Sequence, residues 1–124
     1  MTPDNIHVPS QCNRVTPILS RIGDKWAVLI VILLANGSLR FSELRKRISN
    51  ISQRMLTFTL RNLERDGLVK RTVTPSVPPR VDYELTSLGQ SLLKVLHELG
   101  NWASQNADHI ESAQKHYDKL NPTE

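Results

Sequence analysis

The sequence predicts one mainly α-helical (α+β) domain, with a helix-turn-helix, a two-stranded β-hairpin and a long C-terminal helix in that order. Three observations support this fold class. Apolar residues recur at helical spacing along most of the chain, a short polar turn separates two helical segments, and β-branched residues flank a Pro-rich loop. The length of 124 residues suits a single domain.

The first two helices are predicted at residues 13–22 and 24–35. Pro17 is expected near the first turn of the first helix, where backbone N–H groups have no helical partner. Asp24 is the expected N-cap of the second helix, and Gly37 is expected just beyond its end. The second helix is apolar on every face, so we expect other parts of the protein to cover every face.

Two further helices, separated by a turn at residues 49–51, are predicted in the middle of the chain. Ser52 is the expected N-cap of the second, and Gly67 is the expected residue after its end. Each helix has apolar residues at the spacing of one helical face. They are Phe41, Leu44 and Ile48 in the first helix, and Leu56, Leu60 and Leu63 in the second.

The remaining chain predicts two strands and one long helix. Residues 69–74 are rich in β-branched residues, residues 81–85 alternate between apolar and polar, and residues 75–79 form the exposed hairpin tip. Thr86 is the expected cap of the long helix. The apolar stripe of this helix is close to a heptad repeat, which requires a partner helix, so we expect a dimer interface there. The stripe consists of Leu88, Leu92, Val95, Leu99, Trp102 and Ile110.

Charge is concentrated in residues 40–80. This segment holds ten of the 16 Lys and Arg residues and three of the 12 Asp and Glu residues, and its net charge is +7. Isolated surface charges would explain each residue singly, because most Lys and Arg side chains are exposed. They do not explain this imbalance in one third of the chain. A positive face on a helix-turn-helix is typical of a protein that docks on duplex DNA.

Specific side chains can be assigned to that interface. The second helix of a helix-turn-helix enters the major groove, where Gln can read adenine, Arg can read guanine and a Thr methyl group can contact thymine. The predicted base-reading residues are Ser52, Gln53, Arg54, Thr57 and Arg61. The predicted phosphate contacts are Arg45, Lys46 and Arg47 on the preceding helix, and Lys70, Arg71 and Arg80 on the hairpin.

Five segments, in this order, resemble the HxlR family of bacterial winged helix-turn-helix transcription regulators, which are related to the MarR group. They are Trp26, Arg40-Phe41-Ser42-Glu43-Leu44, Ile51-Ser52-Gln53-Arg54-Met55-Leu56-Thr57, residues 60–69 and Pro78-Pro79-Arg80-Val81-Asp82-Tyr83-Glu84-Leu85-Thr86. The resemblance extends over roughly residues 12–105. Members commonly have Val-Glu-Tyr where this chain has Val81-Asp82-Tyr83, a conservative difference. The resemblance implies a homodimer on an operator with inverted half-sites, and repression or activation of neighbouring genes, with repression as our expectation.

Cys12 is the candidate redox-sensing residue. It precedes a predicted helix start and lies two residues from Arg14, and both features favour the thiolate. The resemblance adds that the family has a Cys near this position, which some members use to sense oxidants or electrophiles. The alternative is an inert, partly buried thiol, as in most proteins with a lone Cys. A small-molecule effector is a further candidate signal, which the sequence does not identify.

Composition excludes several other kinds of protein. The longest apolar run, Trp26 to Ala35, has ten residues, whereas a membrane-spanning helix needs about 20. The single Cys cannot form an internal disulfide, and the four His residues do not have metal-ligand spacing, so we expect neither a metal nor a cofactor. The expected setting is the bacterial cytoplasm, with nucleoid association when the protein is bound to DNA.

The expected organisation is a flexible N-terminal arm at residues 1–11, the helix-turn-helix domain at 12–110, and the end of the last helix with a tail at 111–124. Residues 117–124 are expected to be disordered. The competing functional hypothesis is a protein-interaction module that has kept the winged fold. Such a module would carry apolar residues at the base-reading positions. An enzyme is not expected, because the sequence holds no nucleophile–base pair, paired carboxylates or Gly-rich phosphate loop.

Overall fold

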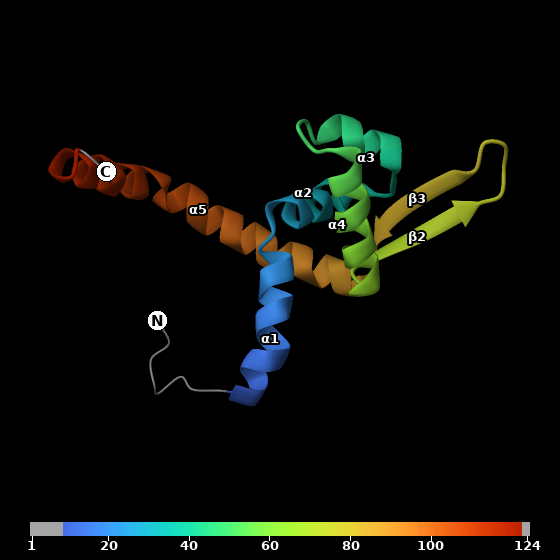
Figure 1. Cartoon of the computed structure of the whole chain (residues 1–124), viewed down its shortest axis with the longest axis horizontal. Helices are drawn as coiled ribbons and strands as arrows, with labels where there is room; N and C mark the ends of the chain where they lie inside the picture. Colours follow the sequence, from blue (N-terminus) through green and yellow to red (C-terminus); the bar gives the residue numbers. More distant parts are fainter. Residues whose placement is uncertain (1–8, 123–124) are drawn as a thin grey trace. The chain divides into compact units, whose positions relative to one another are not determined.

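The computed structural model describes residues 9–122, and for residues 9–12 it describes the backbone alone. In chain order the elements are α1 (Pro9–Ile22), α2 (Lys25–Leu33), the 3-10 helix η2 (Leu34–Asn36), β1 (Leu39–Arg40), α3 (Phe41–Arg47), α4 (Gln53–Arg65), β2 (Val69–Thr74), β3 (Arg80–Leu85) and α5 (Ser87–Leu120) (Figure 1). The chain divides into two compact units, residues 1–90 and 91–124. The predicted fold class is confirmed, including the long C-terminal helix.

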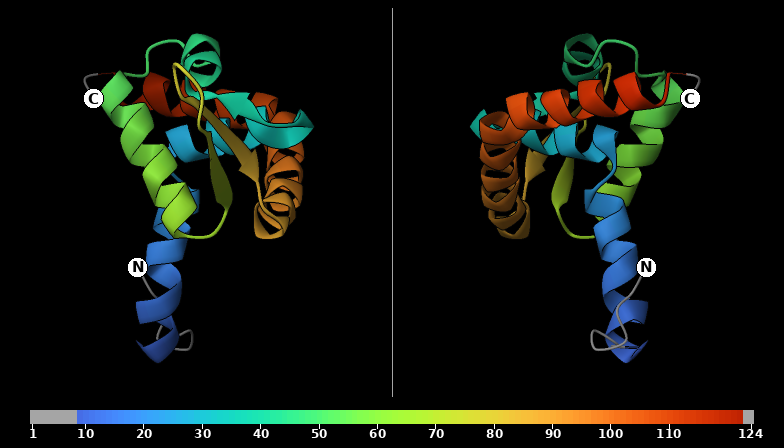
Figure 2. Two further views of the ribbon diagram at one scale, coloured as in Figure 1. Left: turned by 90° about the vertical axis from the view of Figure 1, so that its right-hand side faces the viewer. Right: turned by 90° about the vertical axis from the view of Figure 1, so that its left-hand side faces the viewer.

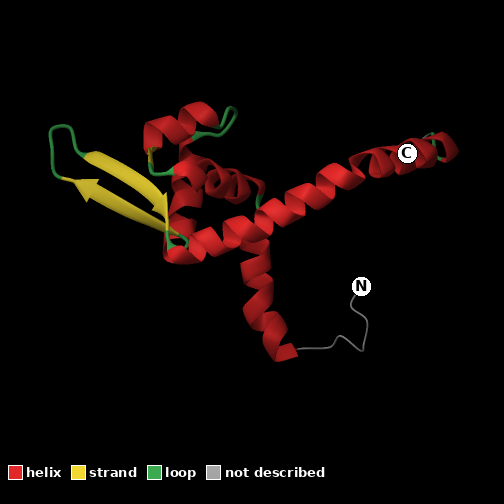
Figure 3. Cartoon of the chain, turned by 180° about the vertical axis from the view of Figure 1, so that it is seen from behind, coloured by secondary structure: helices red, strands yellow, loops and turns green. Residues whose placement is uncertain are grey.

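The three strands form one antiparallel sheet in the order β1-β3-β2. Figure 3 shows β2 and β3 as a hairpin that extends away from the helices of residues 9–90. Val69 is paired with Leu85, and Val73 with Val81. The prediction of only two strands was incomplete, because Leu39 is paired with Tyr83 and so adds β1 as a third strand. With two residues, β1 is too short to show the alternation by which a strand is predicted.

The core of residues 1–90 lies between α2, α3, α4 and the base of the sheet. Within this unit α2 packs against α4, and the side views in Figure 2 show the two helices together. All three apolar residues predicted for the inner face of α4 are buried: Leu56, Leu60 and Leu63. Burial of each such side chain contributes about 1.5–3 kcal/mol. This anchoring fixes which face of α4 points outward.

Three predicted caps are confirmed by their hydrogen bonds. The Asp24 carboxylate accepts from the backbone N–H of Ala27 at 3.0 Å, and the Ser52 hydroxyl accepts from that of Met55 at 3.0 Å. Thr86 accepts from the backbone N–H of Gly89 at 3.1 Å. Each cap satisfies an N–H group that has no partner within its helix. The starts of α2, α4 and α5 are therefore defined by local sequence.

The junction from α4 to α5 is closely packed. Gly67 has a φ of 79°, a left-handed conformation that suits glycine, and it turns the chain from α4 into β2. The Thr86 hydroxyl donates to the Gly67 carbonyl at 2.6 Å, and the Thr86 N–H donates to the Leu68 carbonyl at 3.1 Å. Gly89 lies so close to the Leu68 carbonyl oxygen that a Cβ atom would collide with it. The first turn of α5 is thus held directly against the turn after α4.

The first helix differs from the prediction. It begins at Pro9, so Pro17 lies in its interior and not near its first turn. The prediction about Pro17 was therefore wrong. An interior Pro removes one helical hydrogen bond. Here residues 13–20 are all exposed, so water can hydrate the carbonyl group that loses its partner.

Two further expectations were wrong. The second helix ends at Leu33 and continues as η2, and its surface is not covered on every face, since Leu29 and Ile32 are 39% and 40% exposed. At the other end of the chain, α5 extends to Leu120, so residues 117–120 are helical and not disordered. The rest of the predicted arm and tail, residues 1–8 and 123–124, lies outside the described residues.

Candidate nucleic-acid interface

The outward side of α4 is set by its buried side. At about 100° per residue, the helical positions opposite Leu56, Leu60 and Leu63 are 54, 58, 61 and 65. The side chains there are exposed, and so are those of Gln53 and Thr57 beside them. We call five of these residues the outer face of α4: Gln53, Arg54, Thr57, Phe58 and Arg61.

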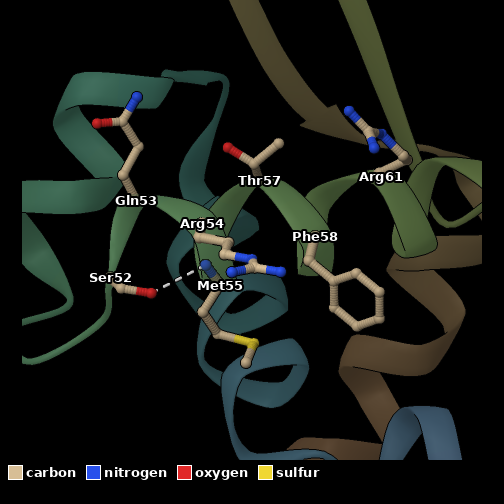
Figure 4. A pocket seen from close by; sticks show the side chains of 7 residues that line it. All are labelled: Ser52, Gln53, Arg54, Met55, Thr57, Phe58 and Arg61. Carbon is tan, nitrogen blue, oxygen red and sulfur yellow. Dashed lines mark hydrogen bonds between the residues drawn. The ribbon is translucent and has the colours of Figure 1, made fainter.

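The outer face of α4 lines a shallow hollow of about 730 Å³, together with Ser52 and Met55. All five predicted base-reading residues therefore lie on one open surface. In Figure 4, Gln53, Thr57 and Arg61 point to one side of the helix, and Met55 and Phe58 point to the other. Arg54 lies across the front between the two groups. Side-chain donors thus line one edge of this open surface, and apolar groups line the other.

One side chain of the outer face is held from α3. Arg45 donates through Nη1 to the Gln53 side-chain oxygen at 3.4 Å. We expected Arg45 to contact phosphate, and its exposed guanidinium still has other N–H groups that are able to do so. The hydrogen bond also restricts the orientation of Gln53. A residue of α3 therefore positions a side chain of α4.

The other two cations predicted on α3, Lys46 and Arg47, are exposed in its last turn. Positive side chains are favourable at the end of a helix, where the backbone carbonyl groups carry partial negative charge. Near the start of the same helix, the backbone N–H of Arg40 donates to the Glu43 carboxylate at 2.8 Å. Both ends of this short helix are therefore stabilised by side chains of its own segment.

The hairpin does not bring its three predicted cations together on one surface. Side chains alternate between the two faces of a strand. Lys70 is paired with Glu84 across the sheet and Arg71 with Tyr83, so Lys70 and Arg71 point to opposite faces. Arg80 shares the face of Lys70 and forms an ion pair with Asp82 at 3.1 Å. Two cations on that face are therefore accompanied by two carboxylates.

Arg40 and Phe58 were missed as candidate interface residues. Arg40 and Arg80 both line a second hollow of about 550 Å³ between the start of α3 and the hairpin tip. Nothing in the sequence links these two residues, which lie 40 positions apart. Phe58 could have been found, because it lies four residues after Arg54 and so on the same helical face.

The apolar stripe predicted on α5 is largely exposed in the single chain. Leu88, Val95, Leu99 and Trp102 are between 54% and 60% exposed, and Ile110 is 40% exposed. Leu92 is intermediate. The stripe also continues beyond the prediction, through Ala113, Tyr117 and Leu120. Val15, Ile18 and Leu19 form a second exposed apolar group on α1.

Cys12 and Trp26 lie outside the outer face of α4. Cys12 belongs to α1, but its side chain lies outside the described residues. Trp26 is partly buried, and the Lys25 ammonium lies 4.5 Å from the centre of its ring, a cation–π contact.

Among residues with described side chains, no three His, Cys, Asp or Glu are grouped to hold a metal ion. No described helix has the length and apolar character required to cross a membrane.

The chain matches a known family of regulators. Residues 21–111 match the family described as HxlR-like helix-turn-helix. An HTH-type transcriptional regulator of Methanothermobacter thermautotrophicus is 47% identical over 95 residues, which cover 77% of this chain and 72% of the relative.

Two solved structures are also similar to this chain. The redox regulator HypR in its reduced form has a TM-score of 0.74 at 40% identity, covering 80% of this chain and 98% of HypR. The reduced form of the transcriptional regulator YodB from Bacillus subtilis has a TM-score of 0.66 at 34% identity, covering 85% of this chain and 94% of YodB.

Proposed function

The chain belongs to the HxlR-like helix-turn-helix family, and from that premise we propose that it is a sequence-specific repressor that binds an inverted-repeat operator as a homodimer. It is a transcriptional regulator of the helix-turn-helix type. One observation supports the proposal of sequence-specific DNA binding. The five base-reading residues predicted from sequence lie on a single exposed hollow of α4, opposite its buried side.

In this proposal α4 lies in the major groove. Arg54 and Arg61 donate to guanine, Gln53 reads adenine and the Thr57 methyl group contacts thymine. Lys46, Arg47 and the hairpin cations contact phosphate and add affinity without sequence information, as does the free part of Arg45. The net charge of +7 over residues 40–80 supports these contacts.

The proposed homodimer is formed by the stripe on α5, with help from α1. The stripe is long and exposed in the single chain, and a stripe near heptad spacing packs best against a second helix. Two-fold symmetry then places two copies of α4 roughly 34–36 Å apart, which is one turn of DNA. Residues 12–110 are the proposed winged helix-turn-helix domain, between the arm at 1–11 and the tail at 111–124.

Cys12 is the proposed redox sensor. HypR is described as a redox regulator, and YodB is similar to this chain in both its reduced and its diamide-treated forms. An oxidant would convert the Cys12 thiolate to a sulfenic acid, which a second thiol converts to a disulfide with loss of water. The chain has one Cys, so that thiol comes from the partner subunit or from a small thiol. The test measures the DNA affinity of the parent protein and of Cys12→Ser, each before and after oxidation. Equal affinity in all four samples would exclude Cys12 as a redox sensor.

The DNA-binding proposal is tested by selection from a random pool of duplex DNA. We expect one enriched motif with inverted symmetry. Arg54→Ala should then reduce the preference for this motif over random DNA, since each good bidentate base contact contributes about 1–3 kcal/mol of discrimination. Absence of any enriched motif would refute sequence-specific binding and favour the interaction-module alternative.

A further inference from the structure

Phe58 is an unusual residue on the outer face of α4. It is 58% exposed, whereas Leu56, Leu60 and Leu63 of the same helix are buried in the core. A large aromatic side chain left exposed in this way costs solvation free energy unless a partner covers it. The ring of Phe58 is therefore available to a partner that contacts α4.

The surroundings of Phe58 indicate which partner that is. Arg54, Phe58 and Arg61 follow one another at i, i+4 and i+7, so along the helix axis the ring lies between the two cations, on the opposite edge from Arg61 (Figure 4). Gln53 and Thr57 complete the same hollow. An apolar protein surface would leave both guanidinium groups buried without partners, which is costly. A surface that combines an apolar patch with hydrogen-bond acceptors fits better.

The major-groove edge of DNA has this combination. Thymine presents its C5 methyl group there, and guanine presents two acceptors that suit Arg. The distance along α4 from Arg54 to Arg61 is about 10 Å, or roughly three base steps. We propose that Phe58 is a specificity-determining residue that contacts the C5 methyl group of a thymine, which lies between the bases read by Arg54 and Arg61. This inference rests on the proposed DNA-binding function.

The test uses the full-length protein and the operator found by selection. Each thymine of one half-site is replaced in turn by deoxyuridine, which removes only the C5 methyl group. We expect the parent protein to lose about fourfold in affinity at one position, the equivalent of one buried methyl-sized group. In Phe58→Ala the same replacement should have no effect, while the effects of other base changes remain.

Thr57 supplies the matched comparison, because its methyl group is the other apolar group able to reach thymine. Thr57→Ser removes that methyl group and keeps the hydroxyl. If deoxyuridine sensitivity persists in Phe58→Ala and disappears in Thr57→Ser, the contact belongs to Thr57 and the proposal for Phe58 is overturned. Insensitivity of the parent protein at every thymine also overturns it, although sequence-specific binding would stand. If selection returns no motif, both proposals fail together.

Two controls separate contact from indirect effects. Thermal unfolding of Phe58→Ala should match the parent protein closely, since an exposed side chain contributes little to packing. Phe58→Leu should retain part of the deoxyuridine sensitivity, because Leu is apolar and smaller. Light scattering should give the same mass for Phe58→Ala as for the parent. A change in mass would assign the ring to a contact between copies of this chain and overturn the proposal.

Discussion

Gly89→Ala should destabilise the protein, although Gly to Ala changes in helices usually do the opposite. In a helix interior the change gains about 0.8–1.0 kcal/mol. At Gly89 the new Cβ atom collides with the Leu68 carbonyl oxygen, which is backbone and cannot rotate away. Overpacking of this kind costs about 1–3 kcal/mol. The displacement also weakens the hydrogen bond from the Thr86 N–H to Leu68, which contributes about 0.5–1.5 kcal/mol. We expect a net loss of roughly 1–3 kcal/mol.

Gly100 in the same helix provides the control. A Cβ atom there would meet no heavy atom within 4 Å. Gly100→Ala should therefore stabilise the protein by up to about 1 kcal/mol. Urea unfolding of both variants, followed by circular dichroism at one protein concentration, measures the difference between them, which is expected to be about 1–4 kcal/mol. If both variants gained stability equally, the close packing of α5 against the turn after α4 would be refuted.

Four further predictions concern the core, a phosphate contact, the positioning of Gln53 and the dimer. Leu60→Ala should cost about 2–5 kcal/mol in urea unfolding, because Leu60 is fully buried; a loss below about 1 kcal/mol would contradict its place in the core. Lys46→Ala should lower the salt slope of DNA affinity by about 1 and weaken all sequences alike. Arg45→Ala, which releases Gln53, should also reduce the preference for the operator, and a purely uniform weakening would argue against that positioning role. Leu99→Lys should shift the light-scattering mass toward the 14.1 kDa of one chain, whereas an unchanged dimer would exclude Leu99 from the interface.

Local signals in the sequence predicted most of the elements. Asp24, Ser52 and Thr86 each precede a helix and accept from a backbone N–H within the next three residues, so a short window holds all the information. Gly67 is a similar case, because a left-handed turn requires little beyond the residue itself. The order of apolar and polar residues in α4 likewise predicted its buried and exposed faces, since both follow from helical periodicity.

The features that were missed depend on parts of the chain that lie far apart. Strand β1 exists because Leu39 meets Tyr83, and no property of two residues predicts that pairing. Strand alternation alone puts Lys70 and Arg71 on opposite faces, but the face that Arg80 shares depends on the strand register, which becomes known only with the paired strand. Coverage of α2 also depends on the arrangement of other elements. The sequence shows an apolar residue at Leu29, but it does not show which element packs against that residue.

The position of β2 has a consequence that is separate from DNA. It is an outer strand of the sheet, and its residues beyond Val69 are all exposed. Such an edge, rich in β-branched residues, can pair with the same edge of another molecule and start aggregation. Lys70 and Arg71 place charge on both faces of this edge, and Pro75 follows its end. Removal of both cations would leave an uncharged β-branched edge. We therefore expect the variant that lacks both Lys70 and Arg71 to lose solubility, whether or not these residues contact DNA.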